Sequence, residues 1–151
     1  MKRIPLLLIV MAACVVQVAS QPAEKPSFNG TWVLQSTGFS EIYTFQHDAK
    51  RLHVIERIDD DLGKRTVTAE ATIDGLPHHQ AVLKGDDLML RVQWFGESLI
   101  WETRREGTAG IYYNRRVMKL VGHDEIRALR TRFLPGPEQS WDEVWLRQSE
   151  K

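Results

Sequence analysis

Residues 66–74 read Thr-Val-Thr-Ala-Glu-Ala-Thr-Ile-Asp, in which polar and apolar side chains alternate at every position. Residues 87–95 repeat the pattern as Asp-Leu-Met-Leu-Arg-Val-Gln-Trp-Phe, with leucine, leucine, valine and tryptophan on one face. A period of two is typical of a β-strand that turns one face to the core and the other to solvent. Sheets with one solvated face are usually antiparallel. These two stretches therefore predict an antiparallel, all-β protein.

Eight more stretches have strand-like patterns, and short segments rich in Gly, Asp and Pro separate them. These stretches are 30–35, 41–47, 51–59, 78–84, 98–105, 110–121, 125–133 and 141–148. The connections are too short for crossover helices, so we expect consecutive strands to pair as a meander. No stretch has helical periodicity, although a short helical turn fits at 136–140. A meander of about 8–10 strands hides its edges most easily by closing into a barrel.

The first twenty residues, 1–20, have the pattern of a signal peptide. A basic start is followed by an apolar run over 4–18 and by small residues before the expected cut after Ser20. The run is shorter than the roughly 20 residues that a membrane span needs. Residues 21–27 are expected to be a flexible lead-in, and 28–149 to form one barrel domain. The protein is therefore predicted to be exported, either periplasmic or secreted.

Cys14 is the only cysteine, and it lies inside this leader. The small residues before it resemble a bacterial lipoprotein box, so the alternative is a protein anchored by lipid in the cell envelope. Only in that case do we expect a membrane partner. With either cleavage the mature domain has no thiol for a disulfide or for Cys-ligated zinc. The chain balances 20 basic against 20 acidic residues, and so lacks the electrostatic footprint of a nucleic-acid binder.

Residues 28–34 read Phe-Asn-Gly-Thr-Trp-Val-Leu and open the mature domain with a Gly-x-Trp triplet, Gly30 and Trp32. This opening resembles that of the lipocalin and calycin barrels. It is more closely similar to small exported lipocalin-like proteins of bacteria, whose functions are largely unknown. The stretch 117–148, with its Gly-Pro-containing loop and its final Arg-Gln, resembles the end of the same proteins. The resemblance implies a lipocalin-like barrel, with Trp32 plugging one end and space for a small molecule. It implies no activity, because one fold hosts many functions.

Polar residues that share an inner face with aromatic ones predict a ligand site in this barrel. In the strand expected at 110–121, Met118 and Leu120 mark the inner face, which also carries a tyrosine, an asparagine and an arginine. An apolar pocket with a few convergent polar groups is typical of small-ligand sites. The predicted ligand-binding residues are Trp94, Trp101, Tyr112, Asn114 and Arg116.

Arg116 is the most demanding member of this set. A buried arginine needs an acceptor, either an internal carboxylate or the carboxylate or phosphate of a ligand. The alternative is that Arg116 sits at the mouth of the barrel, solvated or paired with a glutamate.

The sequence carries no pattern that assigns catalysis, a metal or a cofactor. His47 and His53 straddle an expected turn, whereas the adjacent His78 and His79 must point to opposite faces of a strand. Two candidate ligands fall short of the three or four that zinc needs. No G-x-S-x-G, P-loop or dinucleotide-binding pattern is present in the sequence. We therefore assign no catalytic residue, no metal ligand and no cofactor.

Three hypotheses of function follow. The first is an exported barrel that binds a small hydrophobic or amphipathic ligand. One version of this hypothesis is that the ligand is an acid. The second is an envelope interaction or structural protein with a filled core, acting through exposed aromatic side chains such as Phe95 or Trp141. The third is a cofactor-free isomerase or hydrolase working in the cavity. An internal cavity separates the first from the second, and a cluster of titratable groups with shifted pKa values inside the barrel favours the third.

Overall fold

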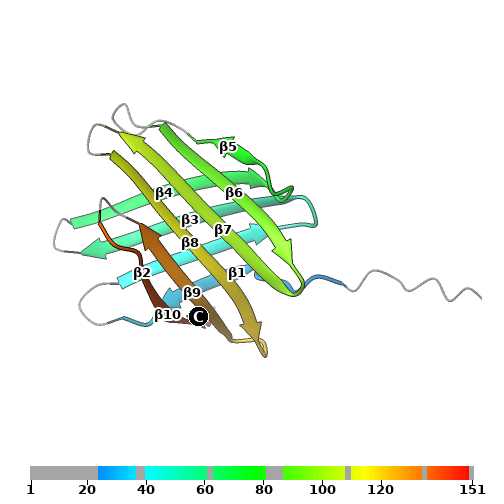
Figure 1. Ribbon diagram of the computed structural model, residues 1–151. Coiled ribbons are helices and arrows are strands. Elements are labelled where there is room, and N and C mark those ends of the chain that lie inside the picture. Colours follow the sequence, from blue (N-terminus) through cyan, green and yellow to red (C-terminus); the bar gives the residue numbers. More distant parts are fainter. Residues whose placement is uncertain are drawn as a thin grey trace, which may run out of the picture.

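The computed structural model describes residues 24–36, 40–60, 63–80, 87–107, 110–133 and 136–149, and these form strands and turns (Figure 1). The strands are β1 (Gly30–Leu34), β2 (Ser40–His47), β3 (Arg51–Asp60), β4 (Gly63–Thr72), β5 (Pro77–His79), β6 (Asp87–Phe95), β7 (Ser98–Gly107), β8 (Gly110–Val121), β9 (Glu125–Phe133) and β10 (Gln139–Arg147). All of them belong to one sheet, and the described residues contain no helix. The all-β, antiparallel class predicted from the alternation is confirmed.

The sheet order is β4-β3-β2-β1-β10-β9-β8-β7-β6-β5, so the first strand pairs with the last and the meander closes on itself. Figure 1 shows β6 to β9 crossing over β1 to β4. The remaining seam lies between β4 and β5. There the side-chain amide of Gln80 accepts a hydrogen bond from the Glu70 N–H at 3.1 Å and donates one to the Glu70 carbonyl at 2.8 Å. The result is the nearly closed barrel that the turn spacing predicted.

Two local expectations differ from the structure. The strand expected at 78–84 is only the short β5, and residues 81–86 lie outside the described residues. The helical turn expected at 136–140 is absent, because β10 begins at Gln139 and pairs at once with β9. The expected leader, its cleavage site and Cys14 also lie outside the described residues.

The side chains alternate in and out along each strand as predicted, and one core fills the barrel. Its fully buried members come from nearly every strand: Phe28, Trp32, Tyr43, Phe45, Leu52, Val54, Leu90, Val92, Leu99, Met118, Ile126 and Trp145. Burying aromatic and aliphatic side chains of this size is the main source of stability in a domain without disulfides.

One end of the barrel is closed by the segment that precedes β1. Trp32 is completely buried, and its indole N–H donates a hydrogen bond of 2.8 Å to the carbonyl of Phe28. The guanidinium carbon of Arg147 lies 4.2 Å from the centroid of the Trp32 ring. Arg147 also donates to the carbonyls of Asn29 and His123, each at 2.7 Å. We call Phe28, Trp32 and Arg147 the floor of the barrel.

The packing of this floor requires a glycine at position 30. Its φ is +126°, a value that side-chain-bearing residues rarely adopt, and a Cβ placed on it would collide with the guanidinium group of Arg147. The Gly-x-Trp triplet thus has a physical reason: the glycine makes room for the arginine that covers the tryptophan.

Candidate functional site

Six polar residues interrupt the apolar inner faces of the strands. We call them the inner polar cluster: Glu41, Glu56, Asn114, Arg116, Arg130 and Glu143. Glu41 and Asn114 lie in the first half of β2 and β8 and Arg130 in the second half of β9, whereas Glu56, Arg116 and Glu143 lie at the middle of β3, β8 and β10. Because these strands alternate in direction, the cluster extends from the middle of the barrel toward the end opposite the floor.

Arg116 lies inside the barrel, with only 3% of its surface exposed. Its Nε donates a hydrogen bond of 3.0 Å to Glu143 Oε2. Its Nη2 donates one of 3.1 Å to the hydroxyl of Tyr43 and lies 3.6 Å from Glu41 Oε2. Of the alternatives left open by the sequence, the structure therefore gives Arg116 an internal carboxylate as its acceptor.

Aromatic rings surround the same guanidinium group. Its carbon lies 5.3 Å from the ring centroid of Tyr43, 5.7 Å from that of Trp101 and 5.4 Å from that of Trp145. Cation–π attraction at such distances strengthens when water is excluded. Burial alone would lower the pKa of Arg116, but the oxygen of Tyr43 and the carboxylate of Glu143 raise it above its ordinary value. Arg116 is therefore a permanent positive charge inside the barrel.

Glu143 forms ion pairs with two arginines at once. While Oε2 accepts from Arg116, it also accepts from the indole N–H of Trp145 at 3.2 Å. Oε1 accepts from Arg130 Nη1 at 3.0 Å. The Nε of Arg130 in turn donates to Asn114 Oδ1 at 2.8 Å. Charged groups buried this deeply are tolerated only when they are paired in this way.

The hydroxyl of Tyr43 contacts two carboxyl groups. Glu41 Oε2 lies 2.6 Å from it, and Glu56 Oε1 lies in a short hydrogen bond to the same oxygen. Burial raises the pKa of Tyr43 well above its ordinary value, so the phenol is neutral. Burial also raises the pKa of Glu56, and the hydrogen bond from Tyr43 only partly offsets this.

A cavity of about 400 Å³ opens between this cluster and the seam of the barrel. One wall is polar and consists of Glu41, Glu56, Asn114, Arg116 and Arg130. The wall toward the seam is mostly apolar and includes Val54, Val67, Ala69, Leu88 and Leu90. The two walls adjoin on β3 and β4, where Val67 pairs with Glu56. Pockets for small ligands typically measure about 300–1,000 Å³ and combine apolar lining with a few polar groups.

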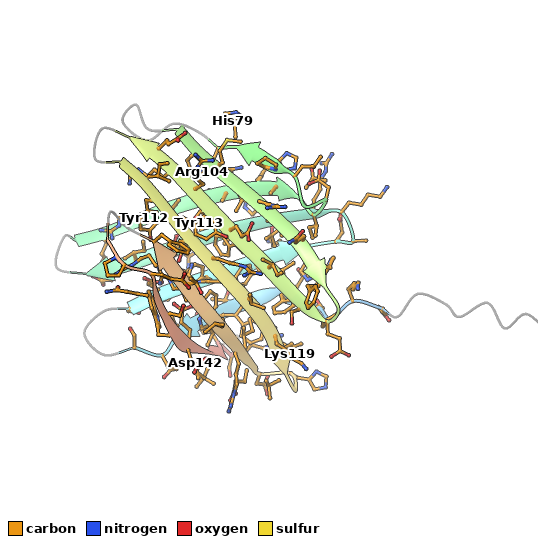
Figure 2. The ribbon with its side chains drawn as sticks, viewed as in Figure 1. His79, Arg104, Tyr112, Tyr113, Lys119 and Asp142 are labelled. Atoms are coloured by element: carbon orange, nitrogen blue, oxygen red, sulfur yellow. The ribbon has the colours of Figure 1, made fainter. Side chains whose placement is uncertain are left out.

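The rim of the cavity carries Arg65, Arg105 and Tyr112, which lie near the mouth-side ends of β4, β7 and β8. Both arginines are exposed. Figure 2 labels Tyr112 and Tyr113, neighbours on β8 that point to opposite faces. Tyr112 lines the cavity, whereas the hydroxyl of Tyr113 donates to Glu102 Oε1 at 2.9 Å. Burial, followed by the hydrogen bond to Glu102, raises the pKa of Tyr113 to about 12.

The structure brings together four of the predicted ligand-binding residues, because Trp101, Tyr112, Asn114 and Arg116 all line this cavity. Trp94 is not among them. Its ring lies 6.0 Å from that of Phe28 and 5.9 Å from that of His47, next to the floor. Trp94 does point inward, as the alternation predicted. It lies near the end of β6, however, at the level of the floor and away from the cavity.

The sequence interpretation missed Glu41, Glu56, Arg130 and Glu143, as well as Tyr43 that joins them. Each of them occupies an inward position in the same period-two alternation. The signal was a charged residue on an otherwise apolar face, as in Glu41, Tyr43, Phe45 along β2.

Four of the five histidines, His47, His53, His78 and His79, line a separate hollow of about 720 Å³. His53 Nδ1 lies 2.8 Å from Glu70 Oε1, and His78 Nε2 lies 3.0 Å from Asp74 Oδ1. The hydrogen bond from His78 lowers the pKa of Asp74. Among the described residues, no group of three His, Cys, Asp or Glu side chains is arranged to hold a metal ion.

In the part of the chain that the structure describes, no helix has the length and apolar character to cross a membrane.

The barrel and its cavity define this chain as a small β-barrel protein, and known structures share the fold. A secretory abundant heat soluble (SAHS) protein from Ramazzottius varieornatus is similar with a TM-score of 0.57 and 8% identity, over 81% of this chain and 95% of that chain. Secretory abundant heat soluble protein 4 from the same organism gives a TM-score of 0.58 and 15% identity, over 87% of this chain and 100% of that chain. At these identities the likeness shows the fold alone.

No protein-family model matches the chain, and no curated protein matches it. The similar structures are consistent with the lipocalin-like barrel that the opening triplet implied. They give no support to the bacterial origin that was part of the same expectation.

Proposed function

We propose that this protein is an exported carrier or receptor that binds a small amphipathic molecule inside its barrel. The observation that carries the proposal is the cavity of about 400 Å³ with one polar and one apolar wall. A molecule with an apolar body and a polar end would satisfy both walls at once. Export rests on the sequence pattern of residues 1–20, and a periplasmic or secreted location follows from it.

The filled-core alternative is less well supported, because it leaves this cavity without a role. Phe95 is 73% exposed, as that alternative requires. Trp141, however, lies between the guanidinium groups of Arg130 and Arg132, whose carbons are 5.1 and 5.4 Å from its ring centroid. It is thus engaged within the protein rather than offered to a partner.

A cofactor-free enzyme remains the second candidate, and one specific observation favours it. Glu56 lines the cavity, and burial raises its pKa. A buried carboxyl group with a raised pKa, placed in a cavity, is a candidate general acid or base. Binding of a ligand precedes either use of the cavity, so the first experiment is the same for both.

Native mass spectrometry of the protein purified from the cells that make it tests the proposal. A bound molecule, released on activation and identified by its mass, is the expected result. The variant Ala69→Phe should abolish this added mass by filling the cavity from its apolar wall. The matched control Thr68→Phe adds the same ring to the exposed face of β4 and should retain the molecule. A bare mass for the wild-type protein together with no uptake of added amphiphiles would contradict the proposal.

A further inference from the structure

The contacts of Tyr43 show where the inner polar cluster can hold an extra proton. The hydroxyl oxygen accepts a hydrogen bond from Arg116 Nη2 at 3.1 Å. It also lies within hydrogen-bond distance of one oxygen of Glu41 and of one oxygen of Glu56. A neutral phenol has a single proton and can donate to only one of these carboxyl oxygens. The contact with the other carboxyl group is satisfied only when that group is protonated and donates to the phenol oxygen, so the geometry favours a second proton that the cluster holds only part of the time.

Glu56 is the better candidate for this second proton. Glu41 forms an ion pair with Arg116, whose guanidinium nitrogen lies 3.6 Å from its carboxylate oxygen. Burial raises the pKa of Glu56, and the nearby Glu41 adds to this, whereas Tyr43, Arg116 and Arg130 oppose it. The groups around Glu56 are therefore Glu41 and Tyr43 on the neighbouring β2, and Arg116 and Arg130 on β8 and β9. Arg65, on the other neighbouring strand β4, lines the same cavity.

The second proton sets the charge that a ligand meets. Arg116 and Arg130 are opposed by the carboxyl groups of Glu41, Glu56 and Glu143. With all three carboxyls ionised, the cluster would carry one net negative charge and repel an anion. With one proton shared between Glu56 and Tyr43, it is neutral.

The two arginines at the rim add positive charge next to this neutral cluster. Arg65 and Arg105 line the mouth of the cavity, whatever other contacts they make, and the acidic side chains lining the same cavity are Glu41 and Glu56. Arginine is the side chain best suited to hold a carboxylate or a similar planar anion. The apolar wall continues inward from the rim, through Leu88 and Leu90.

We propose that the ligand is an amphipathic organic anion, bound with its head group at the Arg65–Arg105 rim and its apolar part against the seam, and that its binding is coupled to proton uptake at Glu56. This inference rests on the proposed binding function and names the chemical class of the ligand. The coupling is reciprocal: an anion in the cavity favours protonated Glu56, and protonated Glu56 favours the anion.

Decanoate, decanol and decylamine test the inference, because they share one apolar chain and differ in head group. In isothermal titration calorimetry at neutral pH, decanoate should bind about tenfold more tightly than decanol, and decylamine should bind most weakly. Repeating the decanoate titration in buffers of different ionisation enthalpy should reveal the uptake of part of a proton. Decanol should bind without it.

Three variants assign these effects. Glu56→Gln imitates the protonated carboxyl, so it should bind decanoate at least as tightly as the wild type and lose the proton uptake. Arg105→Gln should weaken decanoate about tenfold and leave decanol unchanged. Arg104→Gln, next to it on β7 but pointing outward to Glu106 at 2.8 Å, is the matched control and should change neither (Figure 2).

Equal affinity for decanoate and decanol would overturn the anion inference while leaving the binding function in place. Proton uptake that persists in Glu56→Gln would overturn the role of Glu56. If none of the three probes binds, and Ala69→Phe and wild type are both bare in native mass spectrometry, the proposed function fails and this inference fails with it.

Discussion

The floor and the inner polar cluster are built from the same kind of alternating strands, yet the floor is packed with side chains and the cluster lies beside a cavity. At the floor, Trp32 is covered by Phe28 and Arg147, and its indole N–H has an acceptor. In the polar half, Arg116 is held by Glu143 and faces a cavity. At the floor, the inward side chains fill the interior. In the polar half, the inward side chains place charges beside a cavity. Burying charges in this way costs desolvation free energy, and charges beside a cavity are typical of a ligand site.

The largest expected effect lies in the floor. Trp32→Ala removes a fully buried indole and its hydrogen bond to Phe28, and should lower the free energy of unfolding by about 4 kcal/mol. Urea denaturation monitored by circular dichroism measures this loss. The variant should still bind decanoate under conditions in which it is folded. Loss of binding in the folded variant would show that the two halves are not separate.

The next effect lies in the polar half. Glu143→Gln leaves Arg116 and Arg130 without their shared carboxylate and should cost about 3 kcal/mol. The same denaturation experiment applies. Arg116→Met combined with Glu143→Gln should recover at least half of the loss, because the unpaired buried charge is then removed. A double variant as unstable as the single one would argue that Glu143 acts through packing alone.

A smaller effect is expected at Gly30. Gly30→Ala places a Cβ against Arg147 at a φ of +126° and should cost about 2 kcal/mol. Gly63→Ala, at a φ of +98° with no neighbouring atom within 4 Å, provides the control for backbone strain alone. Thermal denaturation of the two variants compares them. Equal losses would mean that the contact with Arg147 contributes nothing.

The smallest effect depends on pH. Because burial raises the pKa of Glu56 above its ordinary value of 4.5, the folded protein keeps a proton that the unfolded chain releases. The folded state therefore binds more protons in this window, and the contribution of Glu56 to stability falls as pH rises from 4.5 toward the raised value. Glu56→Gln removes that fall, so the stability of the variant relative to wild type should increase as pH rises through this window. A stability difference that is constant across pH would contradict the raised pKa.

The sequence predicts most of the barrel because alternation and turn chemistry are local signals. The inward faces of β4, β6 and β8 follow directly from them, and so does the inward direction of Arg116. Its burial was left open, because a solvated position at the mouth of the barrel fitted the same alternation. Trp94 points inward but lies beside the floor instead of the cavity. Local alternation predicts which way a side chain points, but not how far along the barrel axis it lies.

The partners of Arg116 could not be predicted in the same way. Tyr43 lies 73 residues and Glu143 27 residues from it in the chain. Their contact depends on the closure of β1 against β10 and on the stagger of the strands around the barrel. The inward charges at Glu41, Glu56 and Glu143 were visible as breaks in the apolar faces, and only the closed barrel shows that they meet.

The indole N–H signals of the tryptophans offer the most direct test of the distinction between the two halves. In a ¹H–¹⁵N correlation spectrum, each of the 5 tryptophans gives one indole signal, which Trp→Phe variants assign. Titration with decanoate should shift the signal of Trp101, which lines the cavity and has a buried indole N–H without an acceptor among the described residues. The signal of Trp32 should stay in place. Equal shifts of both, or a shift of Trp32 alone, would contradict a ligand site in the polar half of the barrel.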